Sequence, residues 1–440
     1  MSESKKIPIV RKELLIPFIV ITSLFALWGF ANDVTNPMVT AFKKVMPELS
    51  WFQAYLVQFA FYFGYGCMAL PAALYIRKFS YKSGILLGLA LYALGAFLFF
   101  PASVFESFGF FLISLYVITC GLALLETTAN PLILSLGDKE TATQRLNLAQ
   151  AFNPIGSLTG MMIAQFLVLS QIKSASYDDE SYALLDEAAK AAIKTEDLGT
   201  ISFPYISIGV VVLVVLGIVY MTKIPKVADD DSISFKESMT KIFAKKHFFP
   251  GVLTQMFYVG AQIMCWTAIY QYVEYLNSTR GADEQLNATY WNIIAMSIFL
   301  GGRFVGTALM TKLKAAKILY IYGICAVLCA LGAILIPGIP GLISLVSISL
   351  FMSINFPTIY GIALKDMGDE AKVGSAFLVM AIVGGAIFPP MQGLIIDIGG
   401  PNLADTLILG VPEVKFSFIM PMICLIPVIY YGYSNSKKNK

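Results

Sequence analysis

Residues 107–136 read SFGFFLISLYVITCGLALLETTANPLILSL, and this long apolar stretch carries one charged side chain, Glu126. A helix that crosses a membrane needs about 20 mostly apolar residues in a row. The whole chain shares this character, because 57% of its 440 residues are hydrophobic and 13% are charged. Soluble domains carry about 25% charged residues. The sequence therefore predicts a protein whose solvent is a lipid bilayer.

Twelve stretches of the chain have the length and composition of a membrane span. They are continuous rather than alternating, which predicts helices rather than a β-barrel. The first is too long for the apolar part of a cleavable signal peptide, so we expect it to remain as a helix. The expected spans cover residues 14–42, 52–76, 82–101, 107–136, 145–169, 201–222, 248–275, 285–311, 316–337, 340–365, 371–397 and 412–434.

Lys and Arg residues gather in the loops on one side of these spans. With twelve spans both termini lie on the same side, and that side holds 23 of the 31 basic residues, against 7 on the other. Cytoplasmic loops carry such an excess of Lys and Arg. We therefore expect cytoplasmic termini, a location in the cell inner membrane or plasma membrane, and residues 171–200 outside.

The longest cytoplasmic connection, residues 223–247, divides the spans six and six. A weak internal repeat agrees, because Gly-Asp follows a proline-containing span at 137–138 and again at 368–369. Parallel repeats of this kind are typical of transporters built from two halves. We expect an all-α membrane protein with an N-terminal six-helix half at 1–222, a linker at 223–247 and a C-terminal half at 248–440, which resembles the major facilitator fold.

Composition also argues against several classes of function. The net charge of +3 gives no basis for nucleic-acid binding. The six cysteines lack CxxC spacing and the one histidine, His247, lies in a basic loop, so we expect no zinc site and no histidine proton relay. No GxxxxGK[ST] motif occurs, which argues against ATP-driven transport. We expect no enzyme activity, no cofactor and a monomer.

Two acidic residues, Asp33 and Glu126, lie within apolar spans. A charged group at that depth is costly and usually serves a transport pathway. Desolvation favours the neutral form of a carboxyl group, so such an acid can hold and release a proton. Asp33 at the wet end of a shorter span, and Glu126 in a structural hydrogen bond, are the alternatives. We predict that both acids take part in proton coupling.

Amides and aromatic side chains recur at helical spacing in spans five, seven and ten. An amide both donates and accepts hydrogen bonds, which suits a ligand with many hydroxyl groups. Helix packing is the alternative explanation. The candidate substrate-binding residues are Asn32, Asn36, Asn130, Gln150, Asn153, Tyr258, Gln262, Trp266, Asn355 and Tyr360.

Arg303 is the one basic residue deep inside a predicted span. A buried guanidinium must meet a counter-charge or several hydrogen-bond acceptors. We therefore expect it to neutralise an acid, contact the substrate or serve a structural pair.

Several motifs in both halves belong together. They are FYFGY at 61–65, LETTANP at 125–131, RLNLAQAFN at 145–153, YVGAQ at 258–262 and GRFVGT at 302–307. These motifs resemble the fucose:proton symporter family of the major facilitator superfamily, whose members also take galactose and glucose. The resemblance implies a rocking symporter in which Glu126 serves coupling and in which Gln150, Asn153 and Gln262 are the sugar-site amides.

The chain departs from this family in span one. The family pattern places a second acid where this chain has Asn36, while Asp33 lies one turn earlier. Residues three apart share a helix face. Asp33 is therefore a candidate to replace the missing acid, and the change bears on both the substrate and the coupling ion.

The expected function is symport of a monosaccharide with a proton, with L-fucose, galactose and glucose as candidate substrates. A sodium-coupled sugar transporter is one alternative, because Asn32, Thr35 and Asn36 surround Asp33 with neutral oxygens. A drug:proton antiporter is the other, suggested by the NPIG sequence at 153–156. The many amides favour a hydroxylated substrate. The expected partners are the lipid bilayer, the sugar and the coupling ion.

Overall fold

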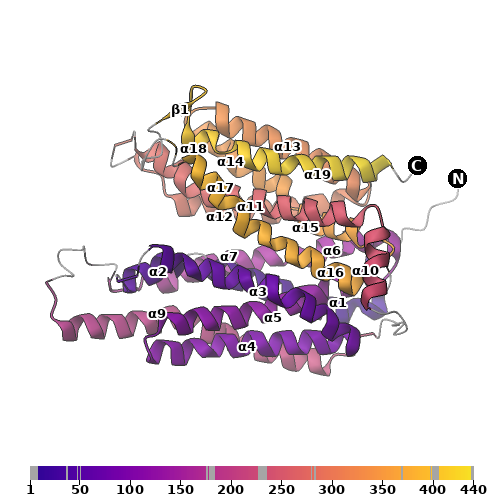
Figure 1. Ribbon diagram of the computed structural model, residues 1–440, viewed down its shortest axis with the longest axis horizontal. Coiled ribbons are helices and arrows are strands. Elements are labelled where there is room, and N and C mark those ends of the chain that lie inside the picture. Colours follow the sequence, from indigo (N-terminus) through magenta and orange to yellow (C-terminus); the bar gives the residue numbers. More distant parts are fainter. Residues whose placement is uncertain are drawn as a thin grey trace. The chain divides into compact units, whose positions relative to one another are not determined.

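The computed structural model is built from helices, with one short strand pair, in the residues that it describes (Figure 1). These are residues 8–35, 38–46, 48–49, 51–174, 177, 184–225, 235–278, 280–281, 284–367, 370–396, 398 and 406–437. Twelve helical stretches within them are long and apolar enough to cross a membrane. An apolar helix suits lipid because its backbone hydrogen bonds are made within the segment. The predicted all-α fold with twelve spans is confirmed.

Contacts between helices divide the chain into two compact units. The amino-terminal unit comprises Leu15–Leu132 and Ile155–Ala228, and the carboxy-terminal unit comprises Met1–Leu14, Ile133–Pro154 and Asp229–Lys440. The chain passes from one unit to the other at four points, and two of them lie beside Pro131 and Pro154.

The amino-terminal unit is made of long helices and one π-helical segment. In this unit α4 packs along α9, and α1 contacts α9. Its elements are α1 (Leu15–Thr35), α2 (Met38–Val45), α3 (Trp51–Lys78), α4 (Tyr81–Val104), α5 (Phe108–Ser135, whose last residues belong to the other unit), α7 (Asn153–Ile163), the π-helix η3 (Ala164–Leu169) and α9 (Glu187–Met221).

The carboxy-terminal unit includes a short helix from the first half of the sequence, α6, which packs against α12 and α15. Within this unit α13 also packs along α14 and α19. Its elements are η1 (Lys12–Leu14), η2 (Lys139–Thr141), α6 (Ala142–Gln150), α10 (Phe235–Ala244), α11 (Phe248–Asn277), α12 (Ala288–Leu309), α13 (Ala315–Leu335), α14 (Gly338–Met352), α15 (Asn355–Ala363), α16 (Ala371–Met380), η7 (Ala381–Val383), α17 (Gly384–Ile396), β1 (Leu407–Ile408), β2 (Val411–Pro412), α18 (Glu413–Phe416) and α19 (Ile419–Lys437).

Several predicted spans are interrupted. The expected span 14–42 covers α1, which is described to Thr35, and α2, which is described from Met38; residues 36 and 37 lie outside the described residues. Spans five and ten contain two-residue turns, between α6 and α7 and between α14 and α15, and span eleven contains the 3-10 segment η7 between α16 and α17. Proline removes a backbone donor and disfavours helix in the preceding residue. Pro154 and Pro357 follow the turns in spans five and ten, and each of the spans expected at 145–169, 340–365 and 371–397 still corresponds to one candidate membrane span.

One expected boundary is also wrong at the start of span six. The prediction placed this span at 201–222, but α9 begins at Glu187, because Asp186 caps it by accepting a hydrogen bond from the Ala189 amide at 2.7 Å. An acidic N-cap satisfies an otherwise free amide of the first turn. The helix therefore extends well beyond its apolar part.

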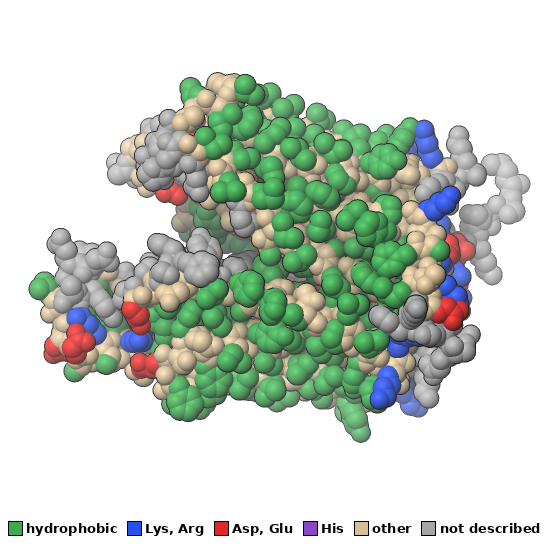
Figure 2. Space-filling model, viewed as in Figure 1, with side chains coloured by type: hydrophobic (Ala, Val, Ile, Leu, Met, Phe, Trp, Pro, Cys, Tyr) green, Lys and Arg blue, Asp and Glu red, His purple; other side chains and the backbone are tan. Residues whose placement is uncertain are grey.

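Side chains on the outer surface match a lipid environment. On the face shown in Figure 2, hydrophobic side chains cover most of the sides of the helices, and Lys and Arg side chains gather where helices end. Large apolar side chains such as Phe100, Phe105 and Val214 are 60% or more exposed. Exposed apolar area on this scale is expected only where the solvent is lipid or a partner.

Candidate functional site

Glu126 lies in the carboxy-terminal half of α5 and is 1% exposed. Neither of its carboxylate oxygens has a hydrogen-bond partner among the described residues. Its backbone carbonyl accepts a hydrogen bond from the side-chain amide of Asn130 at 3.1 Å, and Asn130 is fully buried. A carboxylate buried without a partner is an uncompensated charge, which is far more costly than the neutral acid. The site therefore suits a carboxyl group that carries a proton.

Asp33 is also buried, at 6% exposure, near the carboxyl end of α1. Its neighbour Asn32 is half-buried. Asn36, the third polar residue predicted here, lies outside the described residues. The hydroxyl group of Thr35 lies 3.0 Å from that of Tyr205 on α9. The end of α1 therefore presents a polar, water-poor surface within the amino-terminal unit.

Two tyrosines of α3 accompany the two acids, and they were not among the predicted site residues. The hydroxyl group of Tyr62 interacts electrostatically with the carboxyl group of Asp33, and that of Tyr65 interacts with the carboxyl group of Glu126. The Tyr65 hydroxyl accepts a hydrogen bond from the Trp28 indole at 2.6 Å. The FYFGY motif signalled these residues, because a hydroxyl group in an aromatic span must find a polar partner.

The amide stripe predicted along span five is broken between α6 and α7. Asn147 donates to the Thr143 carbonyl at 2.9 Å and to the Thr358 hydroxyl of α15 at 3.2 Å. Gln150, the last residue of α6, is 3% exposed, and Asn153, the first residue of α7, is half-buried. Asn147 thus serves helix packing, while Gln150 and Asn153 flank the break.

The polar face of α11 contains both bonded and unbonded groups. The Tyr258 hydroxyl donates to the Met352 carbonyl at 2.8 Å, and the Trp266 indole donates to the Ser349 hydroxyl at 3.2 Å. Gln262 lies between them at 9% exposure. Gln255, which the prediction missed, is fully buried with no partner for either side-chain polar atom among the described residues. Its i, i+7 spacing from Gln262 was the available signal.

The start of α15 carries a second buried amide of this kind. Asn355 is fully buried, and neither of its side-chain polar atoms has a partner in the described part of the chain. Tyr360, also fully buried, pairs its hydroxyl group with that of Ser375 and stacks on Phe356 with ring centroids 6.1 Å apart. Buried polar atoms without partners are rare, so Asn355 is a candidate ligand-binding group.

Arg303 of α12 is 3% exposed and meets acceptors from two other elements. Its Nη1 donates to the Gln150 carbonyl at 2.7 Å, and its Nε donates to the Ser353 carbonyl. Its guanidinium carbon lies 4.6 Å from the ring centroid of Phe299. The requirement for several acceptors, stated from the sequence, is met by carbonyl groups and a ring face.

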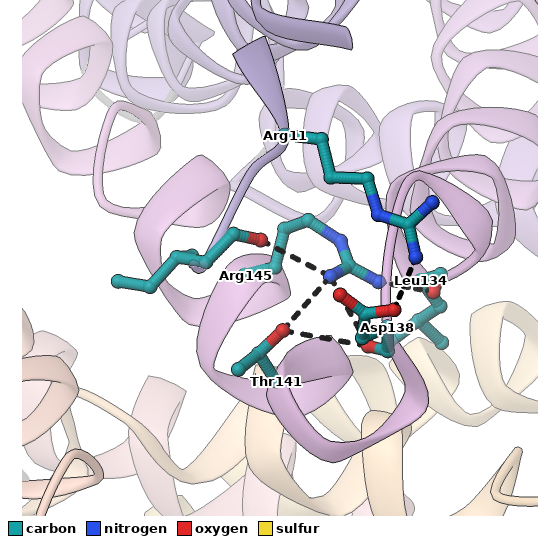
Figure 3. A network of polar contacts seen from close by, with 6 residues as sticks. Arg11, Leu134, Asp138, Thr141 and Arg145 are labelled. Carbon is teal, nitrogen blue, oxygen red and sulfur yellow. Dashed lines mark hydrogen bonds and ion pairs between the residues drawn. The ribbon is translucent and has the colours of Figure 1, made fainter. Parts of the chain in front are cut away.

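A second buried arginine, Arg145, fixes the turn between α5 and α6 (Figure 3). Its Nε donates to the Ile133 carbonyl at 2.7 Å, and its Nη2 donates to the Leu134 carbonyl at 2.5 Å. Its Nη1 contacts the Asp138 carbonyl, while the Asp138 carboxylate forms an ion pair with Arg11. A cation is favourable at a helix carboxyl end, where free carbonyl groups gather. Arg145 therefore holds the end of α5 and the start of α6 together.

Comparison with known proteins places this helical arrangement in a family. The family model of the Major Facilitator Superfamily matches residues 14–389. The L-fucose-proton symporter of Haemophilus influenzae is 51% identical over 430 residues, which cover 97% of each chain. This chain belongs to the fucose:proton symporter family of the major facilitator superfamily. It is a transporter and not an enzyme.

Other relatives and solved structures agree with this membership. The L-fucose-proton symporter of Escherichia coli is 37% identical over 88% of each chain. A crystal structure of the E. coli fucose:proton symporter superposes with a TM-score of 0.83 at 33% identity, covering 96% of this chain and 99% of that one. The glucose/galactose transporter of Brucella abortus is 30% identical over 95% of this chain and 93% of its own. The predicted major facilitator fold is confirmed.

Proposed function

We propose that this protein couples the uptake of L-fucose to the entry of a proton. The observation that carries the proposal is the 51% identity, over 97% of each chain, to a protein named L-fucose-proton symporter. The carboxyl group of Glu126, buried without a partner in α5, supplies a group that can take up and release a proton. Buried amides such as Asn355 suit a hydroxylated ligand.

Galactose and glucose are the alternative sugars, favoured by the 30% identity to a glucose/galactose transporter. The departure at Asn36 and Asp33 supports this alternative, because it changes which hydroxyl group of a sugar meets a carboxylate. We also propose that the termini are cytoplasmic, that the protein lies in the inner or plasma membrane as a monomer, and that the halves 1–222 and 248–440 are its functional divisions.

The test is uptake of radiolabelled L-fucose into proteoliposomes that contain the purified protein. An inward proton gradient should drive accumulation, and a protonophore should abolish it. Unlabelled galactose and glucose as competitors rank the three sugars. Accumulation that needs a sodium gradient instead would establish sodium coupling. Proton-driven export of a lipophilic cation without sugar uptake would establish the antiporter.

We assign sugar binding to the amides Gln150, Asn153 and Gln262, with Asn32, Asn36, Asn130, Tyr258, Trp266, Asn355 and Tyr360 as further candidates. Removing one partner of a buried hydrogen bond costs about 1–3 kcal/mol, or roughly a 5- to 150-fold loss of affinity. Alanine at each of the three amides should weaken fucose binding by that factor in equilibrium binding assays. Gln171→Ala, at an exposed position, is the control. Unchanged affinity in all three variants would reduce these amides to packing groups.

A further inference from the structure

Two prolines leave two carbonyl groups without their helical donors. In a continuous helix the amide of residue i donates to the carbonyl of residue i−4. Pro154 therefore cannot serve the Gln150 carbonyl, and Pro357 cannot serve the Ser353 carbonyl. Helix α6 ends at Gln150, and the break between α14 and α15 falls at Ser353.

Both of these carbonyl groups accept a hydrogen bond from the same side chain, Arg303. Nη1 of Arg303 lies 2.7 Å from the Gln150 oxygen, and Nε bonds the Ser353 oxygen. No carboxylate in the described residues forms an ion pair with Arg303. A helix carboxyl end carries partial negative charge, so two such ends compensate the buried guanidinium. One side chain thus joins α12, α6 and the α14–α15 break.

Two further hydrogen bonds hold α6 at this junction. Gln144 donates to the Thr307 carbonyl of α12 at 3.2 Å, and Asn147 donates to the Thr358 hydroxyl of α15 at 3.2 Å. The links just described between α6 and the helices α12 and α15 are hydrogen bonds. Such bonds can exchange with water when the helices separate, whereas an interlocked apolar surface loses its stabilisation on separation.

Buried polar groups near this junction of α6, α12 and α15 have no hydrogen-bond partner among the described residues. Asn355 and Gln255 are fully buried with no partner for either side-chain polar atom, and the Asn147 Oδ1 also lacks one, within the described residues. Gln255 lies on the side of α11 toward α15, because a Cβ atom added at Gly251 would meet Ala363 of α15 and Tyr258 bonds the carbonyl of Met352, the last residue of α14. Amide groups of this kind would gain hydrogen bonds from water if the packed arrangement opened.

We propose that Arg303 is a positioning residue for transport, which clamps α6 to α12 and α15 in one state of the cycle and releases it in another. The polar bonds close the junction, and the unsatisfied amides keep the closed state only modestly favoured. The role in transport rests on the proposed fucose uptake, whereas the clamp itself can be measured without any sugar.

The first test compares Arg303→Lys and Arg303→Gln with the wild type. Lys keeps the charge but lacks the planar fork that reaches two carbonyl groups. Hydrogen–deuterium exchange without sugar should accelerate at least about tenfold in α6 and α15 of both variants, because a charge-assisted bond is lost. Exchange in α13 should stay unchanged. Arg280→Lys and Arg280→Gln, in the loop after α11, are the matched controls. Unchanged exchange in α6 would overturn the clamp.

The second test separates turnover from binding in the same variants. The maximal rate of fucose uptake should fall about tenfold while the equilibrium Kd for fucose changes far less, since the clamp acts on a conformational step. Equal losses of rate and affinity would place Arg303 in sugar binding instead. Wild-type rates with accelerated exchange would make the clamp structural only. Absence of fucose uptake by the wild type refutes the proposed function, and the exchange result still decides the clamp.

A third variant keeps the proposal testable if the Arg303 variants do not fold. Pro357→Ala restores an amide N–H that competes with Arg303 for the Ser353 carbonyl. We expect faster exchange in α6, in the same direction as for Arg303→Gln but smaller. Pro427→Ala, at a proline inside α19 of the same unit, is the control. Exchange in α6 that is equal for the two proline variants would contradict the clamp.

Discussion

Arg303, Arg145 and Glu126 are buried ionisable residues with different surroundings. Arg303 and Arg145 are surrounded by carbonyl oxygens at helix ends, whereas the carboxylate oxygens of Glu126 have no partner among the described residues. An arginine is always charged and must be compensated where it is buried. A carboxyl group can avoid the same cost by holding a proton. The contrast agrees with arginines that hold helix ends together and with a proton-carrying role for Glu126.

The first prediction concerns Glu126. Glu126→Gln keeps the shape of the protonated acid but cannot release a proton. It should abolish uphill accumulation of fucose while it preserves fucose binding and exchange of internal for external sugar. Uptake against a gradient and counterflow in proteoliposomes measure the two activities. Glu274→Gln, at an exposed position of α11, is the control. A Glu126→Gln variant that still concentrates fucose would assign coupling to another residue.

The second prediction concerns Asp33, which is buried close to the end of α1. If Asp33 replaces the acid that family members carry at the position of Asn36, Asp33→Asn should lose proton-driven uptake. Moving the acid with Asp33→Asn/Asn36→Asp should restore part of it. Proton-driven uptake in the wild type, the single variant and the double variant is the measurement. Normal uptake by the single variant would make Asp33 a structural residue.

At the scale of helices, small residues set the closest contacts in each unit. A Cβ atom added to Gly156 of α7 would lie 1.8 Å from the Ala26 carbonyl oxygen of α1. In the carboxy-terminal unit, one added to Gly384 of α17 would lie 2.0 Å from the Met256 carbonyl oxygen of α11. Small residues let membrane helices approach closely where no hydrophobic effect drives them together. The fifth span meets the first in each half, which agrees with the internal repeat.

This contact yields the third prediction. Gly156→Ala should destabilise the protein by about 1–3 kcal/mol or more, because overpacking forces α1 and α7 apart. Gly217→Ala is the matched control, since an added Cβ atom at Gly217 of α9 meets no atom within 4 Å. Apparent unfolding temperature in detergent compares the two. A Gly156→Ala variant as stable as Gly217→Ala would show that the helices adjust without cost.

At the scale of the whole molecule, the distribution of basic residues supports one orientation in the membrane. The side predicted to be cytoplasmic holds 23 of the 31 Lys and Arg residues. Arg11 belongs to this side, and the pKa of its guanidinium is raised by the hydrogen bond and charge of Asp138. The orientation remains a prediction and is tested by labelling.

The fourth prediction states that test. In a background with the six natural cysteines replaced by serine, Leu185→Cys should react with a membrane-impermeant maleimide added to intact cells. Ser232→Cys should react only after the cells are opened. The positive-inside rule gives this direction. Labelling of position 232 alone in intact cells would reverse the orientation.

The elements could be predicted well where composition alone decides them. Span four was expected at 107–136 and α5 covers Phe108–Ser135, because a continuous apolar run has one solution in lipid. The interruption of spans five and ten was not predicted, although Pro154 and Pro357 marked it. A proline can kink a helix or end it, and the outcome depends on what satisfies the freed carbonyl group.

The sequence by itself determined the twelve spans, the family and the burial of Glu126, since these follow from local hydrophobicity and from motifs within single segments. Only the tertiary structure decided the partners of Arg303, because the Gln150 and Ser353 carbonyl groups are distant in sequence and belong to backbone positions that any residue provides. It also showed that, among the described residues, the side-chain amides of Gln255 and Asn355 have no partner while Tyr258 and Trp266 are hydrogen-bonded. Hydrogen-bond partners across helices depend on rotation and depth of packing, which hydrophobic periodicity does not specify.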